Sequence, residues 1–242
     1  MKTILLSFLI IISLGTTAQA QTTKKILELP EFKGIYVNSN YTVYLKQTNK
    51  QEVTVEALTE IYTISDIKVE NGILMVNIDR KPESPNKSIW AKIDDIKLNP
   101  VIKLYVSAKN INELQVNGAG KIISENSLAS DILSLGVAGS GSIDVDIKGN
   151  IVKTEISGAG NITLKGYATS LDVDNGGNGT LMAFNCPVEQ SKVKISGSGN
   201  VEINVTNSLE AMVAGSGSIK HKGNTKNLSK KVYGSGTVDR AY

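Results

Sequence analysis

A pair of glycines separated by one residue recurs seven times between residues 118 and 236 of this 242-residue chain. Each pair lies in a similar stretch, such as GVAGSGSI at 136–143 or KISGSGNV at 194–201, and the first glycines of successive pairs are 18 to 21 residues apart. A fixed period of this length is typical of solenoid proteins, in which each repeat forms one coil. The paired glycines are Gly118 and Gly120, Gly139 and Gly141, Gly158 and Gly160, Gly177 and Gly179, Gly197 and Gly199, Gly215 and Gly217, and Gly234 and Gly236.

Apolar and polar residues alternate on both sides of each pair. From Leu133 to Ile147, every second residue is either aliphatic or one of the two glycines. Because side chains of a strand point alternately to the two faces of a sheet, the paired glycines share the apolar, inward face. We interpret each pair as a place where the coil narrows or turns a corner and where backbone from the opposite wall comes close, since glycine accepts backbone angles closed to other residues.

The rest of each repeat has the features of short strands and turns. Turn sequences such as KGN at 148–150 follow the alternating residues, and Asn71-Gly72 is typical of a tight turn between two strands. Aromatic residues make up only 5% of the chain, so the core has to consist mainly of Val, Ile and Leu. These features predict an all-β fold, a β-helix or β-solenoid with Gly-x-Gly coils of about 19 residues.

The N-terminal part of the chain is less regular. IYVNSNYTVYL at 35–45 aligns with the glycine repeats, with Ser39 and Tyr41 in place of the two glycines, and we expect Tyr41 to fill the space that glycines leave in later coils. We interpret residues 21–110 as an N-terminal β region of degenerate coils and a cap. Residues 111–242 are the glycine-repeat solenoid, and the two parts form one continuous domain.

The first 20 residues, MKTILLSFLIIISLGTTAQA, have the three parts of a secretory signal peptide. Lys2 supplies a positive start, residues 4–14 are mostly apolar, and Ala18-Gln19-Ala20 is a small-x-small cleavage site. We therefore expect residues 1–20 to be removed and the protein to be exported, to the periplasm, the outer surface or the medium. No later segment has 18 uninterrupted apolar residues, so the sequence predicts no transmembrane segment.

Charge and the rare reactive residues narrow the possible partners. The formal net charge is +3, which is too small to indicate nucleic acid or an anionic membrane as a partner. Cys186 is the only cysteine, so it is either buried or an exposed thiol that can pair between chains. His221 is the only histidine, which excludes a histidine-based metal cluster and a conventional catalytic triad, and alternation places it near the inner face. We expect no metal and no cofactor.

Two functional interpretations of the glycines fit less well than the structural one. A phosphate-binding glycine loop occurs once, between a strand and a helix, whereas this motif occurs seven times without helical periodicity. Calcium-binding repeats of nine residues place Asp two positions after the last glycine. In this chain that position holds Ile, Leu or Val in every copy.

The repeated units ISGAGNI, ISGSGNV and VAGSGSI resemble the auto-transporter adhesin "head GIN domain" family of Bacteroidota-type bacteria. The resemblance extends to the opening LPEFKGIYVNSNYTVYL and covers most of residues 28–240. It implies an exported, β-helix-like domain of the cell envelope and brings no catalytic residues with it. Many members look like lipoproteins, and this chain departs from them because its cleavage site has no cysteine.

A polysaccharide-cleaving enzyme on a β-helix scaffold is the main alternative. It requires carboxylates gathered on one outer sheet. The candidates are the outward Asp144 and Asp146, together with Asp172 and Asp174, which precede the fourth glycine pair; weak cation binding and a solvated charge ladder are the other interpretations of these carboxylates. We expect the outward residues five positions after each first glycine to stack in one row: Ile123, Asp144, Thr163, Met182, Glu202, Lys220 and Asp239.

Aromatic and terminal residues suggest two kinds of partner. Trp90 could form a sugar-stacking surface with tyrosines of the N-terminal part, namely Tyr36, Tyr41, Tyr44 and Tyr62. The last coil leaves strand edges unpaired near Tyr242, through which copies of the chain could associate. The sequence therefore predicts an exported, non-enzymatic envelope protein with an adhesin-like binding or structural role, whose partner is a glycan, an envelope protein or a second copy of itself.

Overall fold

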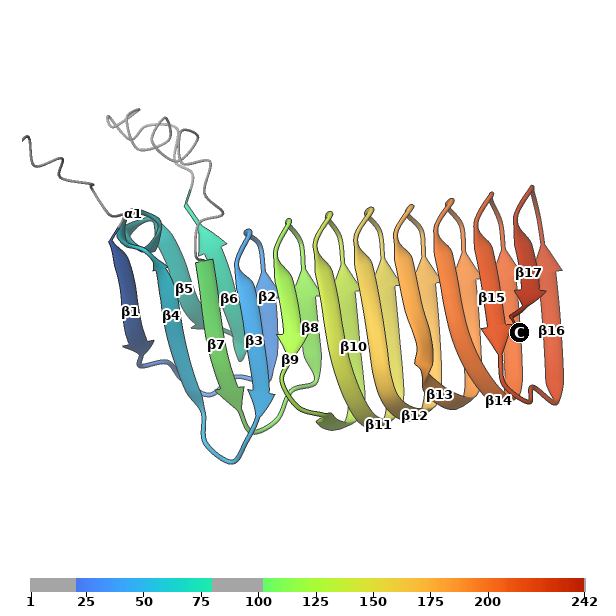
Figure 1. Ribbon diagram of the computed structural model, residues 1–242, viewed down its shortest axis with the longest axis horizontal. Helices are drawn as coiled ribbons and strands as arrows, with labels where there is room; N and C mark the ends of the chain where they lie inside the picture. Colours follow the sequence, from blue (N-terminus) through green and yellow to red (C-terminus); the bar gives the residue numbers. More distant parts are fainter. Residues whose placement is uncertain (1–20, 80–101, 242) are drawn as a thin grey trace, which may run out of the picture.

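The computed structural model describes residues 21–79 and 102–241, which form a rod of stacked coils (Figure 1). Its strands belong to one 17-stranded sheet. The predicted all-β solenoid with coils of about 19 residues is therefore confirmed. The predicted signal peptide at residues 1–20 and the candidate Trp90 lie outside the described residues.

The regular part of the rod is built from strands that pair in parallel with the equivalent strands of the coils on either side. The longer strands continue through the bend at one edge of the rod, so each of them contributes to two coil faces. The strands are β8 (Glu113–Val116), β9 (Lys121–Ser124), β10 (Leu128–Val137), β11 (Ser142–Ile156), β12 (Asn161–Asn175), β13 (Thr180–Ile195), β14 (Asn200–Val213), β15 (Ser218–Lys222), β16 (Asn227–Val232) and β17 (Thr237–Arg240).

Each coil has two faces and two edges. The entry face leads into the glycine pairs and consists of β8, β10, β16 and the C-terminal halves of β11 to β14. The exit face follows the glycine pairs and consists of β9, β15, β17 and the N-terminal halves of β11 to β14. The glycine pairs line the glycine edge, at the top of Figure 1, and the remaining turns, such as 129–131 and 148–150, line the basal edge.

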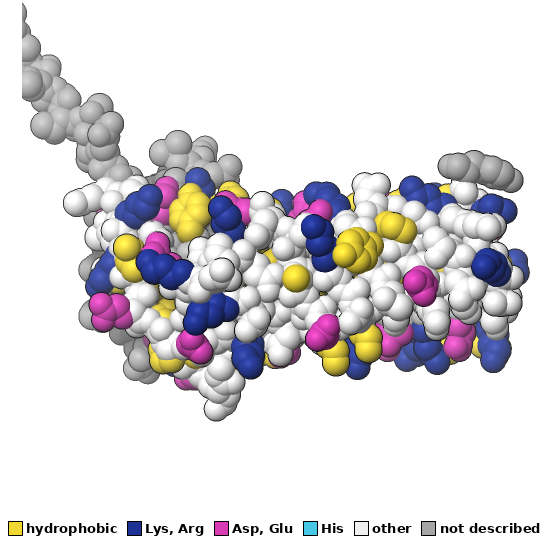
Figure 2. Space-filling view, turned by 90° about the horizontal axis from the view of Figure 1, so that it is seen from below, with side chains coloured by type: hydrophobic (Ala, Val, Ile, Leu, Met, Phe, Trp, Pro, Cys, Tyr) yellow, Lys and Arg dark blue, Asp and Glu magenta, His cyan; other side chains and the backbone are white. Residues whose placement is uncertain are grey.

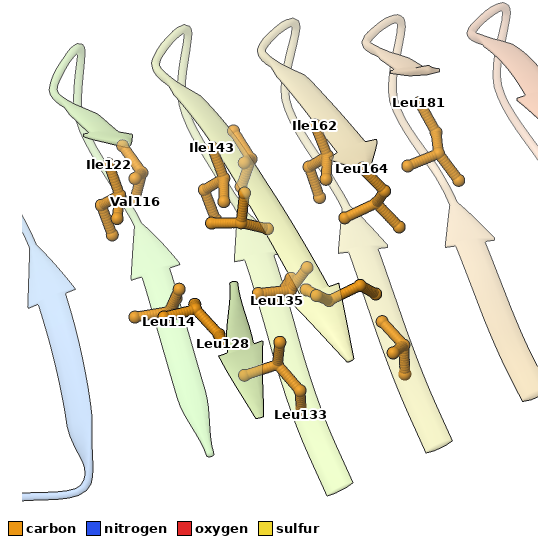
Figure 3. Packing of buried hydrophobic residues seen from close by; sticks show 14 of the residues in the cluster. Leu114, Val116, Ile122, Leu128, Leu133, Leu135, Ile143, Ile162, Leu164 and Leu181 are labelled. Atoms are coloured by element: carbon orange, nitrogen blue, oxygen red, sulfur yellow. The ribbon is translucent and has the colours of Figure 1, made fainter. Parts of the chain in front are cut away.

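Aliphatic side chains fill the space between the two faces, as Figure 3 shows for the first coils of the solenoid. Equivalent residues lie in line along the rod: Val137 is opposite Ile156, and Ile195 is opposite Val213. Thr154, Asn175 and Ser191 are polar residues at inward positions of these middle coils, and all three are buried. A ladder of hydrogen bonds thus holds the coils together while one continuous core is shared by all of them.

The glycine pairs form the tight bends of the glycine edge, as expected, but the contact that excludes a side chain differs from the prediction. A Cβ on Gly139 would lie 2.2 Å from the carbonyl oxygen of Gly118, in the preceding coil. A Cβ on Gly141 would lie 2.4 Å from a Val116 methyl group, also in the preceding coil. The obstacle is therefore the neighbouring coil along the rod and not the opposite wall. The sequence could not distinguish these two obstacles, because the alternation of apolar and polar residues shows only that the glycines face inward.

The N-terminal part of the rod mixes parallel and antiparallel pairs. The Asn71-Gly72 turn joins β5 and β6 as predicted, with positive φ at both residues. No helix of the described ranges is long and apolar enough to cross a membrane. The elements are β1 (Thr22–Leu27), β2 (Gly34–Val37), β3 (Thr42–Gln47), β4 (Glu52–Leu58), α1 (Thr59–Thr63), β5 (Ser65–Glu70), β6 (Ile73–Ile78) and β7 (Ile102–Ala108).

The stacking order in this part differs from the chain order. β2 and β3 pair in parallel with β8 and β9 on one side and with β6 and β7 on the other. The register aligns Val37 with Val116 and Thr42 with Lys121, which confirms the predicted alignment of residues 35–45 with the glycine repeats. The β6–β7 layer thus stacks on the β2–β3 layer, and the later segment lies outside the earlier one. β1, β4 and β5 then extend the two faces by antiparallel pairing.

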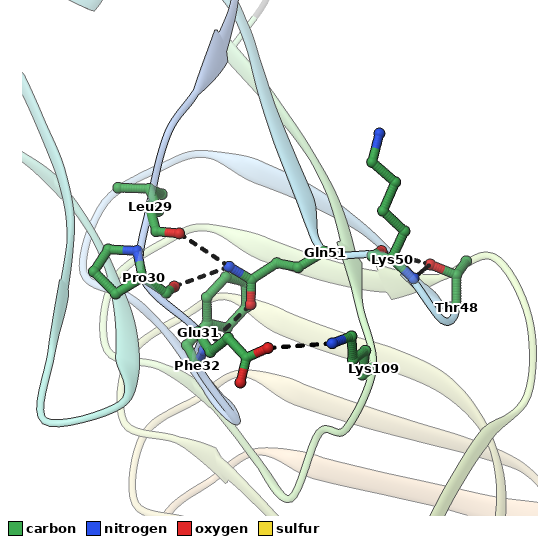
Figure 4. Close-up of polar contacts among 8 residues, drawn as sticks. All are labelled: Leu29, Pro30, Glu31, Phe32, Thr48, Lys50, Gln51 and Lys109. Atoms are coloured by element: carbon green, nitrogen blue, oxygen red, sulfur yellow. Dashed lines mark hydrogen bonds and ion pairs between the residues drawn. The ribbon is translucent and has the colours of Figure 1, made fainter.

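A polar cluster fixes the link between β1 and β2 (Figure 4). The Gln51 side chain donates from Nε2 to the carbonyl oxygens of Leu29 at 3.2 Å and Pro30 at 2.9 Å. Its Oε1 accepts from the Phe32 N–H at 3.3 Å, which holds the buried Phe32 at the start of the coil. One side chain thus satisfies three backbone groups of a linker that lies between the strands.

Candidate functional site

The four candidate aspartates divide between the two faces of the rod. Asp144 and Asp146 lie on the exit face, whereas Asp172 and Asp174 lie on the entry face. The core separates the two pairs, so they cannot act together on one substrate. The described residues hold no group of three or more His, Cys, Asp or Glu side chains placed to bind a metal ion.

The predicted row of outward residues on the exit face is confirmed by the register. Asp144 pairs with Ile123 and Thr163, Met182 with Thr163 and Glu202, and Lys220 with Glu202 and Asp239, which gives one continuous line. This row could be predicted because the sequence shows both the period of the repeat and the alternation of apolar and polar residues.

Lysines of the following coil form ion pairs with Asp144 and Asp174. Lys165 Nζ lies 2.9 Å from Asp144 Oδ1, and Lys194 Nζ lies 3.4 Å from Asp174 Oδ2. Lys153 and Lys192 flank Asp172 in the register of the entry face. These exposed pairs form a charge ladder, in which each cross-strand pair contributes about 0.2–1 kcal/mol. The arrangement supports a structural role for these charges.

A shallow hollow of about 440 Å³ lies on the entry face beside this ladder. Ser134 and the outward Gly136 form its floor, because small residues there leave the sheet uncovered. Four acidic side chains and three lysines line it, so its charges nearly balance: Glu113, Glu155, Asp172, Asp174, Lys153, Lys192 and Lys194. This balance leaves little net charge with which to attract a ligand.

A second hollow, which we call the basal groove, lies on the basal edge and has a volume of about 500 Å³. Figure 2 views the rod from this edge, where hydrophobic and basic side chains gather near the middle coils. The groove crosses five successive coils, because its lining comes from the segments before β2 and β8 and from the bends within β10, β11 and β12. The lining residues are Lys33, Asn110, Ile111, Asn112, Ala129, Ser130, Asp131, Lys148, Gly149, Asn150 and Tyr167.

The basal groove combines an aromatic ring with amide and carboxylate groups. Tyr167 is 55% exposed, although most other large apolar side chains of the rod are buried. Asn150 Nδ2 donates to Asp131 Oδ1 at 3.0 Å, which fixes an amide beside a carboxylate. Ile132 and Ile151 directly follow these two residues, face each other across β10 and β11, and are also exposed. Exposed apolar residues that gather beside a polar hollow are typical of binding sites.

The sequence did not identify Tyr167, but a signal for it was present. The turns KGN at 148–150 and KGY at 165–167 both begin with Lys-Gly, but the register pairs Tyr167 with Lys148, so the two motifs are displaced by two residues. Gly166 has a φ of +92°, and a Cβ there would lie 2.0 Å from the Ile147 carbonyl oxygen. The turn therefore requires glycine at 166 and places the next side chain, Tyr167, on the basal edge.

The N-terminal tyrosines do not form one surface. Tyr41 is fully buried and its hydroxyl hydrogen-bonds the Ser65 hydroxyl at 2.8 Å, in agreement with its expected space-filling role. Tyr36 lies on the entry face, where a hydrogen bond to Glu113 raises the pKa of its hydroxyl to about 12. Tyr44 lies on the opposite side and stacks on Tyr105 with ring centroids 5.3 Å apart.

The single cysteine and the single histidine are both buried. Burial, followed by the Asp146 carboxylate, raises the pKa of the Cys186 thiol to about 12, so the reactive-thiol alternative is excluded. Burial lowers the pKa of His221, and Arg240 and Lys230 lower it further. Among the described residues, His221 Nδ1 has no hydrogen-bond partner. Neither residue is placed for nucleophilic or acid–base chemistry with the aspartates.

Comparison with known proteins identifies the family. Residues 31–225 match the family described as "Putative auto-transporter adhesin, head GIN domain". The chain belongs to this family. The match spans β2, β3 and six of the seven glycine pairs, so the resemblance inferred from the repeats is confirmed. No curated protein matches the sequence.

Solved structures share the fold of this head GIN domain protein. A crystal structure titled as a putative adhesin from Bacteroides fragilis has 22% identity and a TM-score of 0.79, over 92% of this chain and 98% of that one. A putative lipid binding protein from Parabacteroides distasonis has 20% identity and a TM-score of 0.72, over 91% and 97% of the two chains. A putative adhesin from Parabacteroides merdae has 20% identity and a TM-score of 0.68, over 92% and 97%.

Proposed function

We propose that this protein is an exported, non-enzymatic binding protein of the cell envelope, an adhesin-like rod whose ligand lies in the basal groove. The basal groove is the observation that carries the proposal. It joins a half-exposed aromatic ring, a fixed amide–carboxylate pair and two lysines across five coils of a rigid scaffold. A solenoid suits this role because each coil adds one more set of turn residues to the same edge.

The alternative of a polysaccharide-cleaving enzyme has less support. Acid–base cleavage of a glycosidic bond requires two carboxyl groups that flank one bond, usually less than about 10 Å apart. The candidate aspartates are instead divided between the two faces, and two of them are held by lysines. Asp131 is the carboxylate that lines the basal groove, and Asn150, rather than a second acid, is its hydrogen-bond partner.

Binding can be tested with the mature chain on immobilised cell-envelope fractions. Ala129→Trp fills the basal groove at an exposed alanine, whereas Ala159→Trp makes the same change at an exposed alanine of the glycine edge. We expect the first variant to lose most of its binding and the second to bind like the unmodified protein. Equal binding by both variants would show that the groove is not the site.

Catalysis can be tested in parallel on a panel of neutral and acidic polysaccharides, by following reducing ends and unsaturated products. We expect no product. Product formation that is lost in Asp172→Ala or Asp144→Ala would replace the binding role with the enzymatic one.

A further inference from the structure

We infer that the ligand of the basal groove is a linear glycan that runs along the rod, with one sugar ring stacked on Tyr167. This inference rests on the proposed function and names the chemistry of its ligand. Four features carry it: the polar lining, the aromatic ring, the repeat distance of the coils and the charge of the groove.

The polar lining matches a ligand rich in hydroxyl groups. Asn110, Asn112 and Asn150 line the groove with amides, each of which offers both donors and an acceptor. A sugar hydroxyl likewise donates and accepts, so amides can satisfy it in either direction. The hydrogen bond from Asn150 Nδ2 to Asp131 Oδ1 orients this pair and leaves the Asn150 carbonyl oxygen as a further acceptor. Convergent polar groups of this kind fix orientation in binding sites.

The aromatic ring supplies the apolar part of sugar recognition. Sugar rings carry C–H groups on their faces, and such faces pack against aromatic rings. Tyr167 is 55% exposed and belongs to a turn whose backbone is fixed by Gly166. Because the turn is fixed by the neighbouring coil, the ring is presented with little loss of backbone freedom on binding.

The repeat of the coils favours a linear polymer over a small molecule. Adjacent strands lie about 4.8 Å apart, so five coils extend the groove over about 19 Å. The spacing of about 4.8 Å between neighbouring coils is close to the length of one pyranose unit in an extended chain. Successive sugars can thus meet residues of successive coils: Ala129, Lys148 and Tyr167 occupy one register row in three coils, and Asn112 and Lys33 come from the two coils before them.

The charge of the groove disfavours a nucleic acid, and the pairing of its strands disfavours an extended peptide. Lys33 and Lys148 are balanced in part by Asp131, so the groove is too weakly basic for a nucleic acid. An extended peptide gains affinity by adding a strand to a sheet edge, whereas Lys148 and Gly149 of the basal groove already pair with strands on both sides. The two lysines also permit occasional acidic sugars along the glycan.

The decisive experiment measures binding of defined oligosaccharides and of envelope polysaccharides to the mature chain and its variants. We expect Tyr167→Ala to weaken glycan binding by about tenfold or more and Tyr167→Phe to stay within about twofold, because stacking needs the ring and not the hydroxyl. The matched control is Tyr233→Ala, which removes an exposed tyrosine on the glycine edge of the last coil. We expect this variant to bind normally. Circular dichroism and the melting temperature verify that each variant is folded.

Two outcomes separate this inference from the proposed function. Periodate oxidation of the envelope fractions destroys glycans, and we expect it to abolish binding, while protease treatment should leave binding intact. If binding is lost in Ala129→Trp but survives both periodate and Tyr167→Ala, the groove binds a ligand of another class, and the glycan inference fails alone. If Ala129→Trp also binds normally, both proposals fail.

Discussion

The carbonyl oxygen of Gly139 occupies the space that a Cβ on Gly158 would need, with a separation of only 2.2 Å. The same oxygen accepts the Ala159 N–H at 3.0 Å, so it cannot turn away without breaking the bond between two coils. This relationship repeats along the glycine edge: a Cβ on Gly177 or Gly197 would lie 2.1 Å from the equivalent carbonyl oxygen. The spacing of the coils therefore leaves no room for a side chain at these glycine positions.

The first prediction concerns Gly158. Gly158→Ala should lower the free energy of unfolding by about 1–3 kcal/mol or more, because an added Cβ forces two coils apart. The matched control is Gly176→Ala, since a Cβ on Gly176 meets only the Ser196 hydroxyl, at 3.9 Å. That variant should stay within about 0.5 kcal/mol of the unmodified protein. Urea unfolding followed by circular dichroism measures both, and equal midpoints would contradict the steric account.

The second prediction concerns Asn175, which occupies a position held by Val or Ile in the neighbouring coils. Its side chain bonds the Gly179 carbonyl oxygen at 3.0 Å and the Gly177 N–H at 3.2 Å, but both groups also have backbone partners. Asn175→Val should therefore leave stability unchanged or raise it, because no buried group loses its last partner. Asn175→Ala should destabilise by leaving a cavity. A loss of more than about 1 kcal/mol in the valine variant would show that the amide is needed.

The third prediction concerns Cys186, whose thiol pKa is raised from 9.0 to about 12. At pH 8 the folded protein should not react with a thiol reagent, and it should react rapidly in urea. Because the folded pKa lies above the unfolded one, the contribution of the thiol to stability is complete below pH 9 and is lost as the pH rises from 9 to 12. Stability should therefore fall less steeply over this range in Cys186→Ala. Rapid labelling of the folded protein would contradict burial of the thiol.

The fourth prediction concerns association through the last described coil. Lys230 and Arg240 occupy inward positions there, opposite the buried Ala211 and His221. A further copy stacked on this coil would bury both cations, which opposes the self-association considered from the sequence. We expect Lys230→Leu combined with Arg240→Val to raise the apparent mass in light scattering at high concentration.

The control for this prediction is Lys231→Leu, at an outward position opposite Met212, which removes a charge without changing the inward row. It should stay monomeric. Stable oligomers of the unmodified protein that are built through this coil would show that the cations do not block association.

The solenoid could be predicted because its information is local and periodic. The spacing of the glycine pairs gives the coil length, and alternation gives the inward and outward faces, so the stacked row from Ile123 to Asp239 followed correctly. Asp144 and Asp146 were correctly predicted to point outward, but the sequence did not show on which face each candidate aspartate lies, because alternation distinguishes inside from outside and does not distinguish the two outer sheets. Asp144 and Asp174 therefore lie on opposite faces.

The sequence by itself determined the period, the alternating core and the need for glycine at each bend, because each of these depends on residues close together in the chain. The tertiary structure alone decided that β2 and β3 stack between β6–β7 and β8–β9, against the chain order. These three layers carry nearly the same apolar pattern, so the sequence cannot show which layer stacks on which. It also decided that Lys33, Asp131 and Tyr167 meet in one groove, since turns far apart in the chain become neighbours only when coils stack at a fixed spacing.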